Sequence, residues 1–136
     1  MADVTVKRTE DFESTFRGGM LKARAGLGVT SFGIQVLRFP PNSTRYPEHD
    51  HASDGQEEVY TALDGVATLL VGGDEQQLEP GIFARVGPTE KRKLTTGEQG
   101  AVVLVLGGVP GAAFSPKQFT EEGEPDPLAT EGGADV

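Results

Sequence analysis

The sequence predicts an all-β domain, a sandwich or barrel of short strands. Runs of strand-forming residues alternate with turn signals about every 8–12 residues, the rhythm that is typical of such folds. No segment shows the apolar period of a helix of normal length. The 136 residues are enough for one hydrophobic core. The absence of cysteine excludes a disulfide scaffold, a thiolate zinc site and a cysteine nucleophile.

Strand-forming residues define six expected strands, at 32–39, 57–63, 66–71, 83–86, 91–95 and 101–106. Pro40-Pro41 ends the first of them because proline lacks the backbone donor. Asp64-Gly65 is the strongest hairpin signal, so the second and third strands should pair across it. Further turns are expected at 72–74, 79–81 and 87–88. The last strand is apolar on both faces, as a strand covered by two layers would be.

The two ends of the chain differ from the body between them. Residues 1–19 form an expected N-terminal arm, largely polar, in which the spacing of Phe12 and Phe16 suits one short helical turn docked on the body. The body spans residues 20–119. Residues 120–136 hold six acidic residues, no basic one and few large apolar side chains, which predicts a disordered tail. An acidic tail that binds a partner is the alternative.

The net charge of −9 belongs mainly to that tail. Residues 1–119 hold 15 of the 21 acidic residues against all 12 basic ones, so the body is close to neutral. We expect no nucleic-acid partner, because such a partner needs a basic face. The longest apolar run is far shorter than the ~20 residues of a membrane span, and the N-terminus has no signal-peptide pattern. The sequence therefore predicts a cytoplasmic protein without membrane contact.

His49 and His51, the only two histidines, lie two residues apart. In a strand, side chains at i and i+2 project from the same face, so the two imidazoles should converge. With a nearby carboxylate they form a 2-His-1-carboxylate set that suits a transition metal. Glu57 and Glu58 begin the next strand and point to opposite faces, so only one of them can join. On spacing alone the pattern is weak, because histidine pairs also serve as surface or hydrogen-bonded residues.

The stretch from 47 to about 106 resembles a small single-domain cupin. The first motif of that family reads G(x)5HxH(x)3–4E(x)6G. Here His49 and His51 are followed by Glu58 and then, after six intervening residues, by Gly65. The end of the motif selects Glu58, rather than its neighbour, as the inward carboxylate. The match departs from the pattern at Ser43, where the leading glycine is expected.

A second departure is the spacing, because six residues separate the second histidine from the glutamate instead of three or four. We interpret the extra residues as a local insertion looped out at Asp54-Gly55.

The second cupin motif, G(x)5PxG(x)2H(x)3N, is altered in this chain. Counting from Gly81, Gly87 stands at the proline position and Thr89 at the glycine position. Arg92 stands where the fourth metal ligand, a histidine, is expected, and Thr96 at the asparagine position. A guanidinium has no lone pair to give to a metal. The resemblance therefore implies three ligands rather than four.

From the resemblance we expect a cupin-type jelly-roll barrel, a double-stranded β-helix, over residues 20–119. It also implies that His49, His51 and Glu58 hold one divalent transition metal: Fe, Mn, Ni or Zn. The implied activity is of the oxygenase, isomerase or lyase type, on a small organic substrate. Arg92 would orient an anionic substrate group, and Tyr60, on the same strand face as Glu58, would line the pocket or donate a hydrogen bond.

Several alternatives remain open at this point. The barrel could hold a small molecule without catalysis, or His51 and Glu58 could act as a metal-free acid–base pair. Arg92 could pair with Glu58 in a metal-free site, or lie at the rim in a solvated basic run. Tyr60 could be an ordinary core tyrosine. Gln35, on an otherwise apolar strand, is either a polar pocket group or a solvent-facing side chain.

The strands at 57–63, 66–71 and 101–106 carry apolar residues on both faces, more than one barrel interior can bury. The surplus predicts a homodimer, a state that small cupins commonly adopt, or packing against the N-terminal arm.

Overall fold

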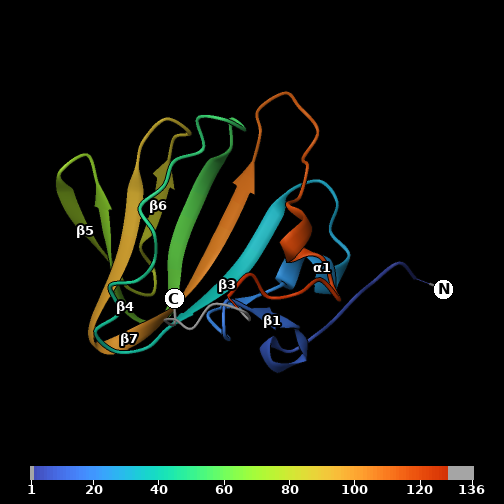
Figure 1. Ribbon diagram of the computed structural model, residues 1–136, viewed down its shortest axis with the longest axis horizontal. Helices are drawn as coiled ribbons and strands as arrows, with labels where there is room; N and C mark the ends of the chain where they lie inside the picture. Colours follow the sequence, from blue (N-terminus) through green and yellow to red (C-terminus); the bar gives the residue numbers. More distant parts are fainter. Residues whose placement is uncertain (1, 129–136) are drawn as a thin grey trace.

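The computed structural model of the protein describes residues 2–128. Within them the regular secondary structure is mostly strand, with three short helical elements, which confirms the all-β prediction (Figure 1). The strands are β1 (Ser14–Thr15), β2 (Met20–Leu21), β3 (Gly33–Phe39), β4 (Glu57–Val71), β5 (Asp74–Leu78), β6 (Phe83–Val86) and β7 (Arg92–Gly108). The helical elements are the 3₁₀ turns η1 (Thr9–Asp11) and η2 (Gln118–Thr120) and the helix α1 (Ala23–Leu27). No helix in this described part is long and apolar enough to cross a membrane.

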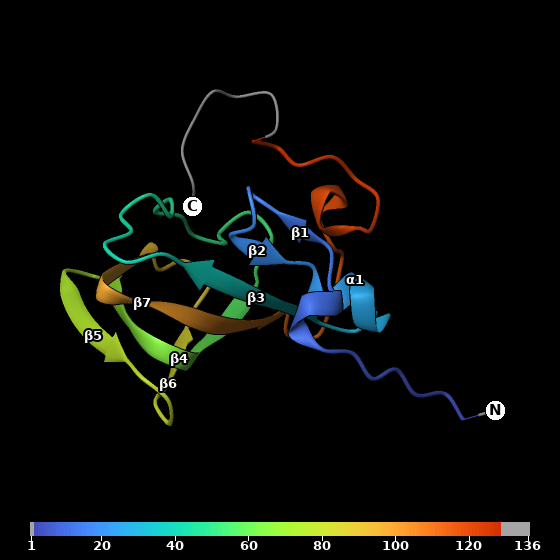
Figure 2. The same ribbon diagram turned by 90° about the horizontal axis from the view of Figure 1, so that it is seen from below.

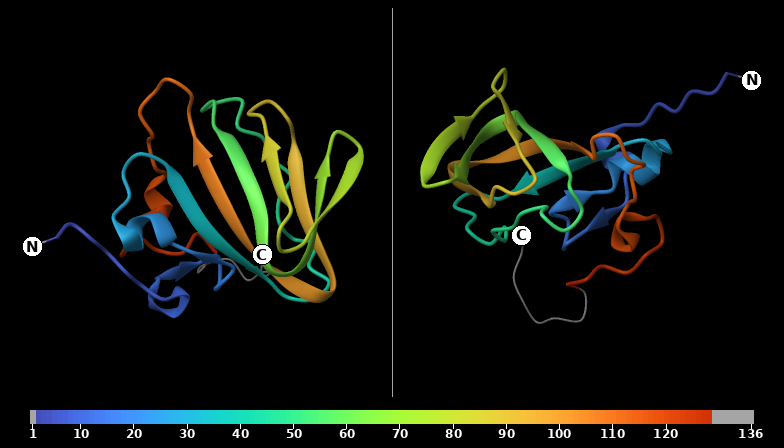
Figure 3. Two further views of the ribbon diagram at one scale, coloured as in Figure 1. Left: turned by 180° about the vertical axis from the view of Figure 1, so that it is seen from behind. Right: turned by 90° about the horizontal axis from the view of Figure 1, so that it is seen from above.

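The strands form one sheet in the order β1-β2-β3-β7-β4-β5, with β6 paired to β4. The long strands β4 and β7 run antiparallel along nearly their whole length, from Glu57 opposite Gly108 to Val71 opposite Arg92. Seen from the front and from behind, these strands bend so that the sheet curls over on itself (Figures 1 and 3). The concave side of the curl receives the core.

Asp64-Gly65 does not form a hairpin turn, so the sequence prediction was wrong at this point. β4 runs straight through the pair, and its register with β7 shifts between Ala62 and Asp64 and between Gly65 and Ala67. Gly65 has a φ of +70°, and a Cβ there would overlap the carbonyl oxygen of Gly100. The glycine therefore serves a β-bulge that bends the sheet, where the local signal indicated a chain reversal.

β7 joins the two strands expected at 91–95 and 101–106 into one. Gly100 links them at a φ of +67°, and a Cβ there would lie 2.7 Å from the carbonyl oxygen of Phe39. β5 was not expected, because four of its five residues are polar and exposed. The turn before it is confirmed: Gly72 and Gly73 both adopt the left-handed conformation that glycine permits.

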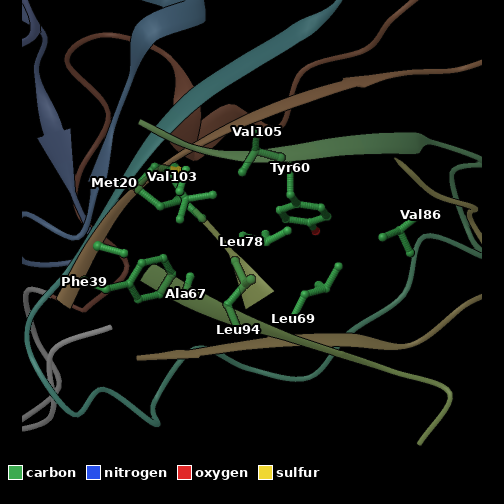
Figure 4. Packing of buried hydrophobic residues seen from close by; sticks show 13 residues of the cluster. Met20, Phe39, Tyr60, Ala67, Leu69, Leu78, Val86, Leu94, Val103 and Val105 are labelled. Carbon is green, nitrogen blue, oxygen red and sulfur yellow. The ribbon is translucent and has the colours of Figure 1, made fainter. Parts of the chain in front are cut away.

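The main core fills the concave face of the sheet. Tyr60 and Ala62 point into it from β4, as strand alternation predicts, and Figure 4 shows Tyr60 among Leu78 and Val105. The buried members are Met20, Leu37, Phe39, Tyr60, Ala62, Ala67, Leu69, Leu78, Val86, Leu94, Ala101, Val103 and Val105.

The N-terminal arm joins the sheet, because β1 pairs with β2 across the expected boundary at residue 19. The helical turn expected from the spacing of Phe12 and Phe16 is not formed: β1 lies between them, and the 3₁₀ turn η1 ends before Phe12. Phe12 packs on a second small cluster of Leu21, Ala23 and Val36 on the other face of the sheet. Phe16 packs against the main core instead.

Residues 120–128 are held against the body, so the expectation of a disordered tail does not hold for this part. Lys22 Nζ donates to the carbonyl oxygens of Glu121 and Glu124, at 2.8 and 3.1 Å. The Phe119 ring meets the Phe16 ring edge to face at 5.2 Å. Figure 2 shows this stretch, in red, beside β1 and α1. We call residues 114–128 the C-terminal strap; the remainder of the predicted tail, 129–136, lies outside the described residues.

Beyond Phe119 the strap is held by polar groups. Arg24 Nη2 lies 2.6 Å from Glu121 Oε1, and the Arg17 backbone N–H donates to Asp126 Oδ2 at 2.7 Å. A count of large side chains misses such contacts, because backbone carbonyls and acidic residues make them.

Candidate metal centre

His49 and His51 lie in the loop between β3 and β4, and their backbone is fixed by the start of β7. His49 N–H donates to the carbonyl of Arg92 at 3.0 Å, and Arg92 N–H donates back to the carbonyl of His49 at 2.8 Å. His51 N–H donates to the carbonyl of Pro88 at 2.8 Å. This extended pairing turns side chains two residues apart to the same side. The two ring centroids are 5.2 Å apart, so the predicted convergence is present.

Both imidazoles have their Nδ1 atoms engaged by groups that can only accept. His49 Nδ1 lies 3.0 Å from the carbonyl oxygen of Pro47, and His51 Nδ1 lies 3.1 Å from both carboxylate oxygens of Asp54. Each Nδ1 must therefore carry the proton and donate it, which leaves the lone pair of a neutral ring on Nε2. This is the tautomer and the outer hydrogen bond that metal-binding histidines use.

Asp54 is the functional residue that sequence reasoning missed. It lies in the inserted stretch, where the N–H groups of Asp54 and Gly55 donate to the carbonyl of His51 and close a turn. That turn loops the extra residues out, as expected, and also brings the Asp54 carboxylate back to the ring of His51. An Asp three residues after a ligand histidine, within a turn, was the available signal.

Glu58 points from β4 toward the histidines, as the cupin motif indicated. Its Oε1 lies 3.2 Å from His51 Nε2. Glu58 is an ion-pair partner of that nitrogen only when the ring is protonated, and in the neutral ring the buried His51 Nε2 has no hydrogen-bond partner in the described structure. A buried nitrogen without a partner normally carries a free-energy penalty, which a ligand at this point would remove. Glu57, by contrast, faces away and pairs with Arg85 at 2.8 Å.

The residues present fit a transition metal. One ligand atom from each of His49, His51 and Glu58 lies within 4.8 Å of the other two. Two imidazole nitrogens and a carboxylate suit Zn, Fe, Ni or Mn better than Ca or Mg, which prefer all-oxygen sets. The fit rests on the orphaned His51 Nε2 and on the two fixed tautomers.

The charges around the site shift its pKa values in opposite directions. The carboxylate of Glu58 raises the pKa of His51, with burial opposing and Asp54 adding to the increase. Burial alone would raise the pKa of Glu58, but His51, Tyr60 and Arg92 outweigh it and hold that pKa below its usual value. Glu58 is therefore an anion at neutral pH.

Arg92 and Tyr60 follow the alternatives stated for them and not the expected substrate-facing roles: Arg92 pairs with Glu58, and Tyr60 lies in the core. Both side chains are completely buried, and neither lines the pocket described below. The three guanidinium nitrogens of Arg92 donate to Glu58 Oε1 at 2.7 Å, to the Glu90 carbonyl at 2.9 Å and to the Gly87 carbonyl at 2.6 Å. Tyr60 Oη donates to the same Glu58 oxygen at 2.6 Å. They are positioning residues behind Glu58, not groups that reach a substrate.

A cavity of about 300 Å³ opens in front of the cluster. His49, His51 and Glu58 line one side of it, and Gln35 reaches it from β3, which supports the pocket alternative for that residue. The other walls are mostly apolar, and part of them comes from the C-terminal strap. A small organic molecule can therefore lie beside the candidate ligands, sheltered from bulk water.

Two glycines placed opposite each other make room for that cavity. Gly33 on β3 pairs with Gly107 on β7, and both line the pocket. A Cβ at Gly33 would lie 3.2 Å from the Phe114 ring, and one at Gly107 would lie 2.6 Å from Gln56 Oε1. Because neither glycine has a side chain, the Phe114 ring and the Gln56 side chain can pack directly against the sheet.

Comparison with solved structures identifies the architecture. A cupin protein from Bacteroides fragilis superimposes with a TM-score of 0.64 at 18% identity, over 88% of this chain and 95% of that one. This protein has the cupin fold. A sugar phosphate isomerase from a cupin superfamily, from Silicibacter pomeroyi, gives a TM-score of 0.61 at 15% identity, over 89% of this chain and 96% of that one.

A third similar structure is the cupin_2 domain of an XRE family transcriptional regulator from Enterobacter cloacae. Its TM-score is 0.53 at 14% identity, over 61% of this chain and 86% of that one. Comparisons with protein-family models and with curated proteins find no match. At these identities the likeness shows the cupin fold alone, because one fold supports many reactions.

Proposed function

We propose that this protein is a metal-dependent enzyme that binds one divalent transition metal and acts on a small organic substrate in the adjoining pocket. His49 Nε2, His51 Nε2 and a carboxylate oxygen of Glu58 would hold the metal. Bound there, a metal of this class supplies Lewis-acid or redox chemistry. The oxygenase, isomerase and lyase types all use such a centre.

The observation that carries the proposal is the outer hydrogen bonding of the two histidines. Pro47 and Asp54 each accept a hydrogen bond from an Nδ1–H group, so each neutral ring keeps its lone pair on Nε2, and the ligand atoms of the two histidines and Glu58 lie within 4.8 Å of one another. A metal-free acid–base pair would need only one oriented imidazole. A second one, held in the same tautomer, supports metal ligation.

The other residues prepare the carboxylate. Arg92 and Tyr60 both donate to Oε1 of Glu58, so they fix its rotation and keep it ionised. In residues 2–128, Oε2 of Glu58 accepts no hydrogen bond that competes with a ligand role. Arg92 also carries a positive charge close to the site, which weakens the affinity for a cation.

The decisive experiment is metal titration of tag-free protein, by calorimetry with Zn²⁺ and by elemental analysis of the protein as purified. We expect one metal per chain, and a loss of at least about tenfold in affinity for His51→Ala. Glu57→Gln is the matched control, because Glu57 neighbours Glu58 but faces away to Arg85. A wild-type protein that binds no transition metal would overturn the proposal.

A second candidate is a metal-free module that binds a small molecule without converting it. The Glu58–Arg92 ion pair favours this reading, since it neutralises the carboxylate without any metal. The cupin_2 domain of a transcriptional regulator among the similar structures is compatible with it. The same titration separates the two candidates, because the module predicts no change in Zn²⁺ binding between wild type and His51→Ala.

A further inference from the structure

The pocket beside the candidate metal centre has aromatic walls. Four rings line it, those of Phe16, Tyr46, Phe114 and Phe119, together with aliphatic side chains of β2, β3 and β7. Burial raises the pKa of Tyr46, so its phenol stays neutral and its ring serves as part of the wall. At about 300 Å³ the cavity lies at the lower end of the range for small-molecule sites, ~300–1,000 Å³. These walls suit a small flat apolar body.

Charge in the pocket is limited to a few groups. The carboxylate of Glu58 is neutralised from behind by Arg92 at 2.7 Å. Among the described residues that line the pocket, Lys117 is the one lysine or arginine. No described carboxylate lies within ion-pair distance of it, although its charge helps to lower the pKa of nearby Asp54. Lys117 is exposed and also lines the cavity, so it lies at the boundary between the cavity and solvent.

Lys117 and two of the aromatic rings belong to the C-terminal strap, which is anchored outside the pocket. The ammonium group of Lys22 donates to Glu13 Oε1 at 2.8 Å and to the carbonyls of Glu121 and Glu124. Three acceptors satisfy all three protons of a side chain that is completely buried. The strap is thereby fixed with Phe114, Lys117 and Phe119 toward the cavity.

We infer that the substrate is a small aromatic monoanion, with its ring between the strap and the sheet and its carboxylate beside Lys117. This inference rests on the proposed function and specifies the substrate of the same site. It differs from a sugar phosphate, the substrate class in the description of the Silicibacter pomeroyi structure. A sugar phosphate carries a dianionic group and several hydroxyls, and each hydroxyl buried against an aromatic wall would lose its hydrogen bonds to water.

The test uses the full-length protein loaded with Zn²⁺ and three probes: 3-phenylpropanoate, its neutral amide, and glucose 6-phosphate. Calorimetry measures affinity, and amide NMR shifts of the strap report where each probe binds. We expect 3-phenylpropanoate to bind about fivefold more tightly than the amide, the scale of one ion pair at a solvent-facing site, and both to bind more tightly than glucose 6-phosphate. The shifts should include residues 114–120.

Lys117→Met tests whether the lysine, and not another group such as the metal, attracts the carboxylate of the probe. We expect it to abolish the preference for the acid over the amide while leaving the affinity for the amide unchanged. Lys7→Met, an exposed lysine outside the pocket lining, is the control and should change neither affinity. Phe114→Ala should weaken both aromatic probes equally. A preference for the acid that survives in Lys117→Met, or stronger binding of glucose 6-phosphate, would overturn the inference.

The outcome is distinguishable from failure of the proposed function. Zn²⁺ affinity is measured first, without any probe, and its absence contradicts the metal proposal alone. Protein that takes up Zn²⁺ but binds neither aromatic probe leaves the metal centre standing and overturns the substrate class. Gly33→Ala provides an independent check, because the added methyl would crowd the Phe114 ring and narrow the cavity. It should weaken the aromatic probes and leave Zn²⁺ affinity unchanged.

Discussion

Arg92 and Lys22 are both completely buried cations, yet they stabilise different parts of the protein. Arg92 lies within the barrel and donates to Glu58 and to two carbonyls of the loop before β7, all at most 34 residues away in sequence. Lys22 lies between β2 and α1 and donates to segments on both sides of it, up to 102 residues away. One cation therefore positions a ligand, and the other holds the strap that closes the pocket.

The free-energy cost of removing a buried cation depends on whether its partners can be hydrated in its absence. Glu58 is itself largely buried, with 11% of its side chain exposed, so it cannot recover water if Arg92 is removed. Glu13 is 38% exposed, and the strap carbonyls become hydrated if the strap lifts. Removal of Arg92 should therefore destabilise the fold more than removal of Lys22.

The largest expected effect is that of Arg92→Met on stability. It leaves Glu58 as a buried anion without its countercharge, which should lower the free energy of unfolding by about 3–5 kcal/mol in metal-free protein. Excess Zn²⁺ should restore part of that loss, since a cation at the proposed site supplies the missing charge. Urea unfolding with and without Zn²⁺ measures both values. A loss below about 1 kcal/mol would contradict the role given to Arg92.

Lys22→Met should have a smaller effect, about 1–3 kcal/mol, because the acceptors it leaves can reach water. The change should also release the strap, seen as faster hydrogen exchange at the Gly123 amide, which donates to Glu13. Removing residues 121–136 should lower the free energy of unfolding by a similar amount. A chain that ends at Leu128 should not, because it keeps every strap contact named above. Equal exchange in Lys22→Met and wild type would show that the lysine does not hold the strap.

Arg92→His tests the same position from the side of the metal. It removes a positive charge and places an imidazole where the cupin motif has its fourth ligand, so Zn²⁺ affinity should rise by about 10- to 100-fold. Calorimetry measures the change, with Lys91→His as control because its exposed neighbouring position lies outside the cluster. Unchanged affinity would mean that the three ligands do not share a centre beside Arg92.

The contacts that hold the strap should weaken as the pH falls. The Lys22 contact lowers the pKa of Glu13, and backbone hydrogen bonds outweigh partial burial to lower that of Asp126. A lowered pKa in the folded state means that the stabilisation is fully present above the ordinary carboxyl value. It is lost as the pH falls through the lowered one. Hydrogen exchange across residues 120–128 should therefore accelerate below about pH 4.5 before the core amides do.

The smallest expected effect concerns the outer face of the sheet, which neither cation serves. Phe83 is 71% exposed and Leu63 is 53% exposed. Large apolar side chains exposed on this face favour the homodimer predicted from the sequence. Light scattering at micromolar concentration should give a dimeric mass, and Phe83→Ser should lower it while leaving the melting temperature nearly unchanged. A monomeric wild type would contradict this prediction.

Local patterns were sufficient for the inward-facing residues. Alternation along β4 correctly placed Glu58 and Tyr60 inside and Glu57 outside, and the motif spacing marked His49 and His51. These predictions succeeded because a side chain's face depends only on its neighbours in the strand. The Asp64-Gly65 prediction failed for the complementary reason: the same dipeptide serves a turn or a bulge, depending on which strand lies opposite.

Strand period, turn signals and motif spacing were enough to predict a β-structure of the cupin type and to single out His49, His51 and Glu58. Strand period and motif spacing are local properties, so they can be recognised in the linear sequence. Only the tertiary structure decided that Arg92 lies behind Glu58, that Asp54 orients His51, and that a buried Lys22 ties the strap over the pocket. Arg92 and Lys22 contact residues that are far apart from them in sequence, and Asp54 reaches His51 across a turn. In each case the atoms come to within about 3 Å, the approach that a hydrogen bond needs, only when the chain folds.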